Sequence, residues 1–397
     1  MNIVLDGVPA RRSANALLHS GFVVAGVVTV ILGPILPILI ARWSLSDEAA
    51  GLFFTLQFCG NLLGILSLGS LISRLGYART IGIGFTFIAA GIAALNLSNE
   101  PISFMATFAF GYGLGLVLSG TNLWIAELAP TRRAAALSIL NVAWGIGAIS
   151  CPLLVLLAQR NHSLGLLLFS ISALSLLLAL ALVNISVEPW PQTGATETTL
   201  HDHPLLRTKT GIALGGLFFL YCGTESAVGG WAGALAKRMG ASPGNLWEIA
   251  PMFFWAGLLA GRALAPLVLR RTSERMILIL GLTLAGASNA ALVWLANFQV
   301  AALCLVGAGF GFSCIFPLLV ASLVGYYGKR ARRVGSVVFA LASLGGATIP
   351  WLVGFTSTKV GSLRIGLIVP LVACVLMLGL LQLLSKQHQE SSDVVLS

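Results

Sequence analysis

The amino-acid sequence predicts an all-α polytopic membrane protein with twelve transmembrane helices in two pseudo-symmetric six-helix bundles. Of its 397 residues, 57% are hydrophobic and only 9% are charged, with a mean hydropathy of +0.94. Soluble domains carry about a quarter of charged residues, so this composition excludes a soluble enzyme, a DNA-binding module and a disordered chain. The apolar residues form long runs, and the longest polar stretch divides these runs into six and six.

Each predicted span is a run of about 20 mostly apolar residues, which is the length that a helix needs to cross the hydrocarbon core. The runs are continuous and do not alternate every second residue, which favours helices over a barrel. In chain order the spans lie at about 18–41, 49–72, 80–98, 102–127, 134–158, 164–186, 210–233, 246–269, 275–296, 299–326, 334–357 and 363–385. We expect residues 1–190 to form the N-terminal bundle, 191–209 a cytoplasmic linker and 210–397 the C-terminal bundle.

The basic residues predict the orientation of these spans. Twelve spans place both termini on one side, and loops with an excess of Lys and Arg face the cytoplasm. The side of the termini holds sixteen basic residues, and the other loops hold six. The sixteen are Arg11, Arg12, Arg74, Arg79, Arg132, Arg133, Arg207, Lys209, Arg270, Arg271, Arg275, Lys329, Arg330, Arg332, Arg333 and Lys386. We therefore expect a multi-pass protein of the cell inner membrane with both termini cytoplasmic, and no nucleic-acid partner.

The cysteines and histidines do not indicate a metal or redox site. All six cysteines fall within predicted spans, and none has the CxxC spacing. His201 and His203 flank Asp202 in the polar linker, where a solvated segment is favoured over a metal site. We expect no metal centre and no cofactor beyond a coupling ion, H+ or Na+.

The two halves of the chain contain matching small-residue motifs in the same order. Such residues are common where membrane helices pack closely. Each match pairs span n with span n+6, so the two halves share one membrane orientation. The matches are Gly69 with Gly261, the GxGxG of Gly111, Gly113 and Gly115 with that of Gly307, Gly309 and Gly311, and Gly145, Gly147 and Pro152 with Gly345, Gly346 and Pro350.

The twelve spans, the basic loop from Ser73 to Arg79 and the loops with Arg132-Arg133 and 329–333 resemble the major facilitator superfamily over essentially the whole chain. This resemblance implies two parallel six-helix bundles around a midplane site, with rocking alternating access.

Within that superfamily, the stretch Leu220–Glu225, followed by Gly230 and Trp231, resembles span seven of the fucose–galactose–hexuronate proton symporters. The resemblance implies uptake of a sugar with a cation. Proton-coupled members of that branch usually carry acids in spans one and four. Here span one is uncharged, and Leu118–Asn122 of span four has no carboxylate.

Glu225 is the one acidic residue that no loop explains. It lies about 15 residues into span seven, near mid-membrane, with Tyr221 one turn away on the same face. An ionisable residue at this depth is costly and usually functional. We expect Glu225 to couple transport to a cation by binding a proton or helping to hold Na+, or to accept sugar hydroxyls. A permanently protonated structural carboxyl is the alternative.

Four other charged residues are assigned to a cytoplasmic gate. Arg262 lies about 12 Å inside span eight, and we expect it to snorkel or to pair with helix ends rather than to clamp an anionic substrate. Glu127 closes span four, in a position that suits a charge network with Arg74 or Arg79.

Amides and aromatic side chains are spread over the spans that line the central cavity in the superfamily. Amides donate and accept hydrogen bonds, as hydroxyl-rich ligands require, and aromatic faces pack on sugar rings. Helix–helix hydrogen bonds and interfacial anchoring are the alternative for each residue alone. The predicted substrate-binding residues are Gln57, Asn61, Asn122, Asn141, Trp144, Tyr221, Glu225, Trp255 and Trp351.

The predicted function is secondary active transport of a small polar solute, most simply a sugar, by cation-coupled symport. The sequence has no GxxxxGK[ST] for ATP, and no HExxH or GxSxG, so an enzyme is not expected. One alternative is a drug–proton antiporter, although the GPxxGG run of such exporters is missing from span five, and another is a non-transporting sensor or scaffold. We expect a monomer whose partners are the lipid bilayer and its solute.

Overall fold

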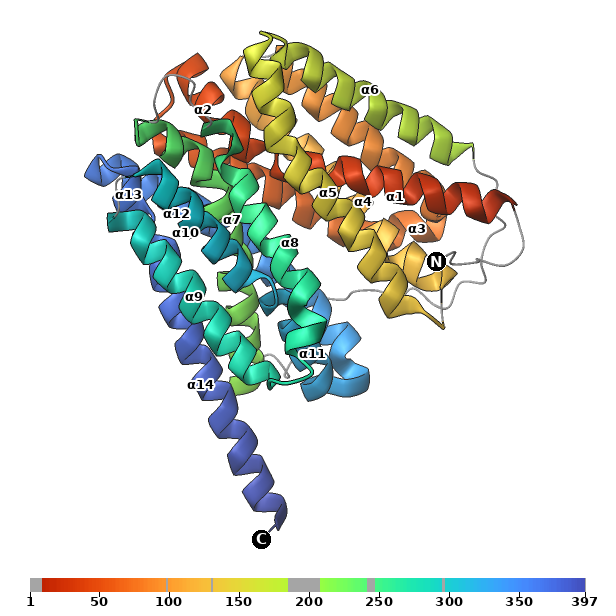
Figure 1. Ribbon diagram of the computed structural model, residues 1–397. Helices are drawn as coiled ribbons and strands as arrows, with labels where there is room; N and C mark the ends of the chain where they lie inside the picture. Colours follow the sequence, from red (N-terminus) through yellow and green to blue (C-terminus); the bar gives the residue numbers. More distant parts are fainter. Residues whose placement is uncertain are drawn as a thin grey trace. The chain divides into compact units, whose positions relative to one another are not determined.

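The computed structural model describes the backbone of residues 9–97, 99–129, 131–184, 208–240, 247–294 and 297–396. These residues form helices and connecting turns (Figure 1). The linker that was predicted at 191–209 lies outside the described residues except for Thr208 and Lys209, and so does the stretch from His201 to His203. Among the described residues, no group of three or more His, Cys, Asp or Glu side chains could hold a metal ion.

The helices follow the twelve predicted spans. The first six spans correspond to α1 (Pro9–Val30), α2 (Leu32–Trp43), α3 (Asp47–Leu97), α4 (Glu100–Leu128), α5 (Arg133–Arg160) and α6 (Leu164–Val183). The last six correspond to α7 (Lys209–Arg238), η2 (Trp247–Ile249) with α8 (Ala250–Val268), α9 (Glu274–Trp294), α10 (Phe298–Phe312), α11 (Ile315–Tyr327), η3 (Gly328–Arg330) with α12 (Ala331–Val360), α13 (Leu363–Gly366) and α14 (Ile368–Leu396).

Ten of the described helices are long and apolar enough to cross a membrane, or eleven if the bent pair α1–α2 is one span. α3 holds two spans, because its 51 residues would extend about 76 Å, more than twice the hydrocarbon thickness. Gly76 interrupts α3 with a φ of 79° and a ψ of 170°. The break falls between predicted spans two and three, so the all-α polytopic fold class is confirmed.

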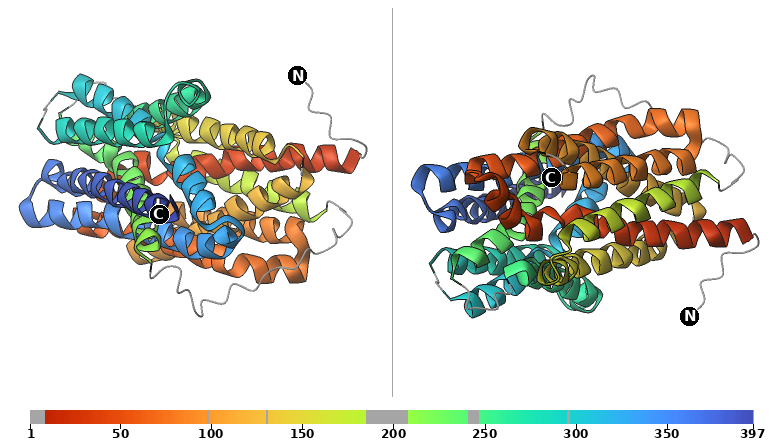
Figure 2. Two further views of the ribbon diagram at one scale, coloured as in Figure 1. Left: turned by 90° about the horizontal axis from the view of Figure 1, so that it is seen from below. Right: turned by 90° about the horizontal axis from the view of Figure 1, so that it is seen from above.

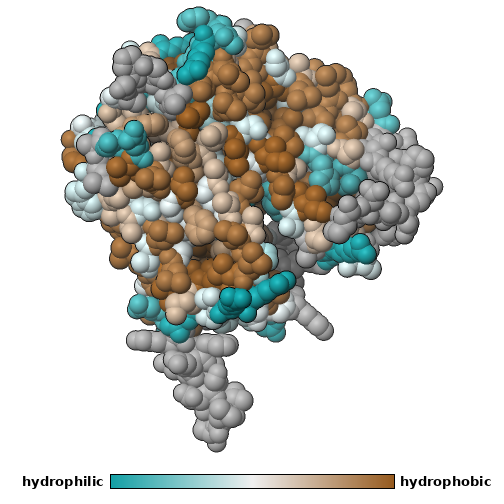
Figure 3. All heavy atoms as spheres, in the orientation of Figure 1, coloured by the Kyte–Doolittle hydropathy of each residue, from teal (hydrophilic) through white to brown (hydrophobic). Residues whose placement is uncertain are grey.

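Most of the surface over the helices is apolar on the face shown in Figure 3, whereas hydrophilic side chains gather near helix ends. Met105 and Leu303 are each 72% exposed, and Leu166 is 69% exposed. Exposed apolar side chains of this kind and number would be unfavourable in water. They fit helices whose outer faces meet lipid.

The chain folds into two compact units. The first unit comprises 1–32 and 56–197, and the second comprises 33–55 and 198–397. Residues 33–55, which hold the second half of span one and the start of span two, therefore pack with the second unit, and the boundary runs through α3 at Thr55.

The two units repeat one packing scheme. In the first unit α1 packs on α4, α5 and α6, and Figure 2 shows α1 and α5 side by side. In the second unit α7 packs in the same way on α10, α12 and α14. Span one thus contacts spans four, five and six, and span seven contacts spans ten, eleven and twelve. This agreement supports the pseudo-symmetric repeat that the glycine motifs predict.

The alternate glycines of the first GxGxG motif let α4 pack closely against two neighbouring helical segments. A Cβ on Gly111 would overlap the carbonyl oxygen of Gln57 in span two, and a Cβ on Gly113 would overlap that of Gly84 in span three. Residues two apart point to nearly opposite sides of a helix. α4 can therefore pack closely on both helices only because positions 111 and 113 carry no side chain.

The second motif uses the same arrangement in a different register. A Cβ on Gly309 would overlap the carbonyl oxygen of Phe254 in span eight, and Gly311 lies against Gly281 in span nine. By its contacts Gly111 thus corresponds to Gly309, whereas the sequence match pairs it with Gly307. A GxGxG motif resembles itself after a shift of two residues, so the motif alone cannot define the register.

We expect Gly309→Ala to destabilise the protein by about 1–3 kcal/mol, because the added methyl meets backbone atoms that cannot rotate away. The matched control is Gly379→Ala, since Gly379 is exposed on α14 and a Cβ there would meet nothing within 4 Å. The measurement is Tm by scanning fluorimetry in detergent. Equal Tm values for the two variants would contradict the assigned contact.

Candidate functional site

Glu225 and Tyr221 lie near the middle of α7. Glu225 is about 24 Å along the helix from Lys209, and its side chain is only 15% exposed. Tyr221 is fully buried one turn earlier, and its hydroxyl donates a hydrogen bond to the carbonyl oxygen of Phe312, 3.2 Å away. The span seven pair predicted from the sequence thus lies inside the second unit.

Arg262 on α8 faces the same place. Its Nη2 lies 3.9 Å from Oε1 of Glu225, and its Nε donates to the carbonyl oxygen of Ser313 over 3.4 Å. A Cβ on Gly261 would overlap the Ser313 hydroxyl, so a glycine at this position lets α8 approach α10 closely. The predicted gate residue Arg262 therefore meets both a helix end and the candidate coupling residue.

Pro317 explains why a carbonyl is available to Arg262. Span ten breaks between Phe312, the last residue of α10, and Ile315, the first of α11. Pro317 has no backbone N–H, so it cannot bond to the carbonyl four residues earlier, which is that of Ser313. In an apolar environment that oxygen needs another donor, and the guanidinium supplies it.

Aromatic rings pack around this break. The ring of Tyr221 lies 6.0 Å from those of Phe312 and Phe316, centroid to centroid. Trp255, only 8% exposed, packs edge-on against Phe254 at 5.0 Å. Trp255 is thus largely covered within its own unit.

Trp351 is half-buried on α12, where its ring lies 5.3 Å from that of Phe355 one turn later. The backbone of Trp351 also contacts Gly51, since a Cβ on that glycine would lie 2.9 Å from the Trp351 Cα. The structure therefore places Trp351 next to span two and not in the group around Glu225.

In the first unit, Gln57 and Trp144 meet at Thr29. Nε2 of Gln57 donates to the Thr29 carbonyl oxygen over 2.9 Å, and Nε1 of Trp144 donates to the Thr29 hydroxyl over 3.4 Å. α1 ends at Val30, so the Thr29 carbonyl is one of the last four of its helix. Sequence reasoning missed Thr29, although it is the only hydroxyl residue between 21 and 43.

The three predicted asparagines are held differently. Nδ2 of Asn122 donates to Leu118 and Nδ2 of Asn141 donates to Leu137, each to a carbonyl of its own helix over 2.8 Å. These bonds orient the two amides. Asn61 is half-buried, and its carbonyl contacts Gly115 at a position that only a glycine permits.

Glu127 lies beside Tyr77, which follows the break at Gly76. The Tyr77 hydroxyl donates to Oε1 of Glu127 over 2.6 Å, and the Tyr77 ring stacks on Trp124 at 5.9 Å. Within the described residues the contact of Glu127 is with Tyr77, while Arg74 and Arg79 are exposed and not within ion-pair distance.

Asp47 forms an ion pair that sequence reasoning missed. It begins α3 and is only 8% exposed, and its carboxylate accepts two hydrogen bonds from the Arg238 guanidinium at the end of α7, one of them 2.7 Å long. The Ser357 hydroxyl on α12 donates to the same carboxylate. The Glu48 backbone N–H donates to the Thr358 hydroxyl over 2.9 Å. These bonds attach residues 33–55 to α7 and α12.

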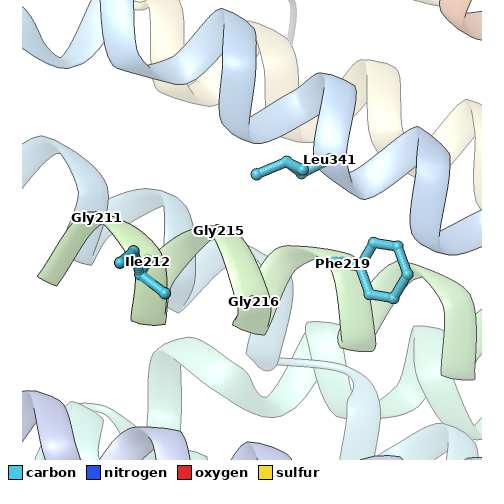
Figure 4. Close-up of a pocket in the computed structure, with 6 residues that line it drawn as sticks. All are labelled: Gly211, Ile212, Gly215, Gly216, Phe219 and Leu341. Carbon is cyan, nitrogen blue, oxygen red and sulfur yellow. The ribbon is translucent and has the colours of Figure 1, made fainter. Parts of the chain in front are cut away.

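An apolar cavity of about 340 Å³ lies beside the first half of α7 (Figure 4). Leu341 on α12 points toward α7 across it, and the remaining lining residues are Gly211, Ile212, Gly215, Gly216 and Phe219. No lining side chain can form a hydrogen bond, so this cavity does not fit a hydroxyl-rich solute.

The described helices form a polytopic membrane fold, and a charged pair, Glu225 with Arg262, lies inside the second unit. The sequence model of the Major Facilitator Superfamily matches residues 18–350, and the chain therefore belongs to that superfamily. The glucose/mannose transporter GlcP of Bacillus subtilis (strain 168) is 24% identical over 359 residues, which cover 85% of this chain and 86% of the relative.

Two solved structures share the fold. A bacterial homologue of the human lysosomal transporter Spinster, in an inward-facing and occupied conformation, has a TM-score of 0.80 and 14% identity and covers 96% of this chain and 98% of its own. A D-xylose–proton symporter has a TM-score of 0.73 and 18% identity, with coverages of 92% and 96%. At these identities the likeness shows the fold alone.

We expect Asp47→Asn and Arg238→Gln each to lower the free energy of unfolding, and with it the Tm. The loss should be below the roughly 1.5–3 kcal/mol of charged hydrogen bonds, because Arg238 is 42% exposed. The double variant should lose little more than either single one, since each single change already breaks the pair. Glu48→Gln is the control, because its bond to Thr358 uses the backbone. Strictly additive losses would exclude the pairing.

Proposed function

We propose that the chain carries a neutral monosaccharide across the cell inner membrane by alternating access, coupled to entry of a cation at Glu225. Both termini then lie in the cytoplasm, as the excess of basic residues on one side favours, and a monomer suffices. The observation that carries the proposal is the Glu225–Arg262 pair, which lies deep within its two spans and away from any loop. The ring of Tyr221, one turn before Glu225, packs on that of Phe312. A carboxylate at that depth is costly unless it has a function.

The neighbouring groups support a neutral, hydroxyl-rich substrate. In the second unit the ionised carboxylate of Glu225 compensates the charge of Arg262, so the ionised pair carries no net charge that would attract an anion. In the first unit the amides of Asn122 and Asn141 and the ring of Trp144 offer hydrogen bonds and a flat apolar face, while Gln57, only 4% exposed, orders the Thr29 carbonyl beside Trp144. The name of the GlcP relative, a glucose/mannose transporter, agrees with this substrate class, as does the span seven resemblance to sugar symporters.

Alternating access gives the coupling its physical basis. A bound ligand shifts a conformational equilibrium only as far as it binds one state more tightly than the other. If the loaded and protonated forms both favour the state that reorients, sugar and proton move together. A sodium ion held by the same carboxylate would give the same thermodynamic coupling.

We expect proteoliposomes containing the protein to accumulate radiolabelled glucose when a proton or sodium gradient is imposed, with mannose, galactose and fucose as competitors. Glu225→Gln should retain sugar exchange but lose accumulation, because it cannot change its charge. The control is Glu274→Gln, an acid in the first turn of α9. Gradient-independent uptake that is identical in wild type and Glu225→Gln would refute the coupling role. A Tm increase with hydrophobic cations but with no sugar would indicate a drug–proton antiporter instead.

We expect Trp144→Ala to weaken sugar binding roughly tenfold, the loss of about 1.4 kcal/mol of ring contact. Trp144→Phe should weaken it less, since it keeps an aromatic face. Trp294→Ala is the control, because Trp294 is 69% exposed at the end of α9. Binding is measured by intrinsic fluorescence or calorimetry, and unchanged affinity in Trp144→Ala would remove Trp144 from the site.

A further inference from the structure

Arg262 contacts two groups, of which only one can change its charge. One is the carboxylate of Glu225, at 3.9 Å, and the other is the carbonyl oxygen of Ser313, at 3.4 Å. Both distances are long for their kind, so the guanidinium lies between its two partners. A charged carboxylate attracts the guanidinium much more strongly than a protonated one, whereas the carbonyl does not titrate.

Few groups near Glu225 can change the position of the Arg262 guanidinium between its two partners. The titratable neighbours of Glu225 are Tyr221 and Cys222 on its own helix and Arg262 on α8. The packed helices add no Asp, Glu, Lys or Arg at this depth, because the sequence has none in 298–328, 334–358 or 365–385. The joint itself adds the Cys314 thiol, whose Sγ lies 3.5 Å from the Ser313 hydroxyl and 3.9 Å from the Gly261 carbonyl oxygen. A change of charge on Glu225 therefore acts chiefly on Arg262.

The carbonyl in question lies at a joint. Ser313 and Cys314 connect α10 to α11, and Pro317 denies Ser313 its usual helical partner. The Ser313 hydroxyl donates back to the carbonyl of Phe310 over 2.6 Å, and Tyr221 donates to Phe312. Among these donors to the joint, Arg262 also contacts a titratable group, the Glu225 carboxylate, which can draw the guanidinium away from the Ser313 carbonyl.

We propose that Arg262 transmits the ionisation of Glu225 to the α10–α11 joint. When a proton adds to the carboxylate, no other covalent bond changes, and the guanidinium settles on the Ser313 carbonyl and holds the joint. When the proton leaves, the guanidinium moves toward Glu225 and the joint loosens. The inference rests on the proposed coupling role of Glu225 and makes Arg262 a positioning residue.

The test is amide hydrogen exchange of peptides that cover 310–318, measured on the intact protein in nanodiscs and corrected for the intrinsic pH dependence of exchange. In wild type we expect greater protection at low pH, with a transition that follows the titration of Glu225 by infrared spectroscopy. In Glu225→Gln the protection should stay high at every pH. This variant leaves Arg262 unchanged and so separates the switch from simple misfolding.

Arg262→Lys should abolish the pH dependence, because a single ammonium cannot span both partners, and Arg270→Lys, eight residues further along and exposed, should retain it. Protection that is independent of pH in wild type, that still varies in Glu225→Gln, or that responds to Na+ but not to pH, would overturn the inference. These results differ from failure of the proposed function, which would appear as gradient-independent uptake, whatever the exchange data show.

Discussion

A backbone carbonyl inside the hydrocarbon must find a donor within the protein, and this constraint falls on side chains wherever a span is broken. α1 ends at Val30 and α10 ends at Phe312. Gln57 donates to the carbonyl of Thr29 near the first break, while Tyr221 and Arg262 donate to those of Phe312 and Ser313 at the second. Three of the residues with the strongest claim on function are thus also the groups that make the broken spans tolerable in lipid.

These contacts restrict the positions that the side chains can take. A long side chain such as that of Arg262 would otherwise sample many rotamers, and binding would have to order it. Here the α10 terminus holds the guanidinium, and the absence of a side chain on Gly261 lets the two helices approach closely enough for that bond. If the proposed solute site includes these side chains, such ordering would reduce the entropic cost of recognition.

Much of this could be predicted from the sequence, for physical reasons. Hydrophobic length acts locally, so the twelve spans follow from runs of residues, and the break at Gly76 falls within the basic loop predicted from Ser73 to Arg79. Glu225 stands out because it lies deep within a span. Asp47 could not be recognised, because its partners Arg238 and Ser357 are far away in sequence and an acid at a helix start is ordinary. The register of the GxGxG repeat and the second partner of Arg262 likewise depend on which helices pack together, a property that no local pattern contains.

The pairing of Glu225 with Arg262 has an electrical consequence. The two side chains together carry no net charge when both are ionised, so the empty carrier with an ionised pair places no monopole in mid-membrane. If Glu225 takes up the coupling proton, as proposed, the arginine charge of the protonated form is uncompensated. A net charge feels the transmembrane potential at about 2.3 kcal/mol per 100 mV if it crosses the whole field. In a cell whose interior is negative, voltage would then favour the inward step of the protonated form and have little hold on the return, so the membrane potential itself would give transport a direction.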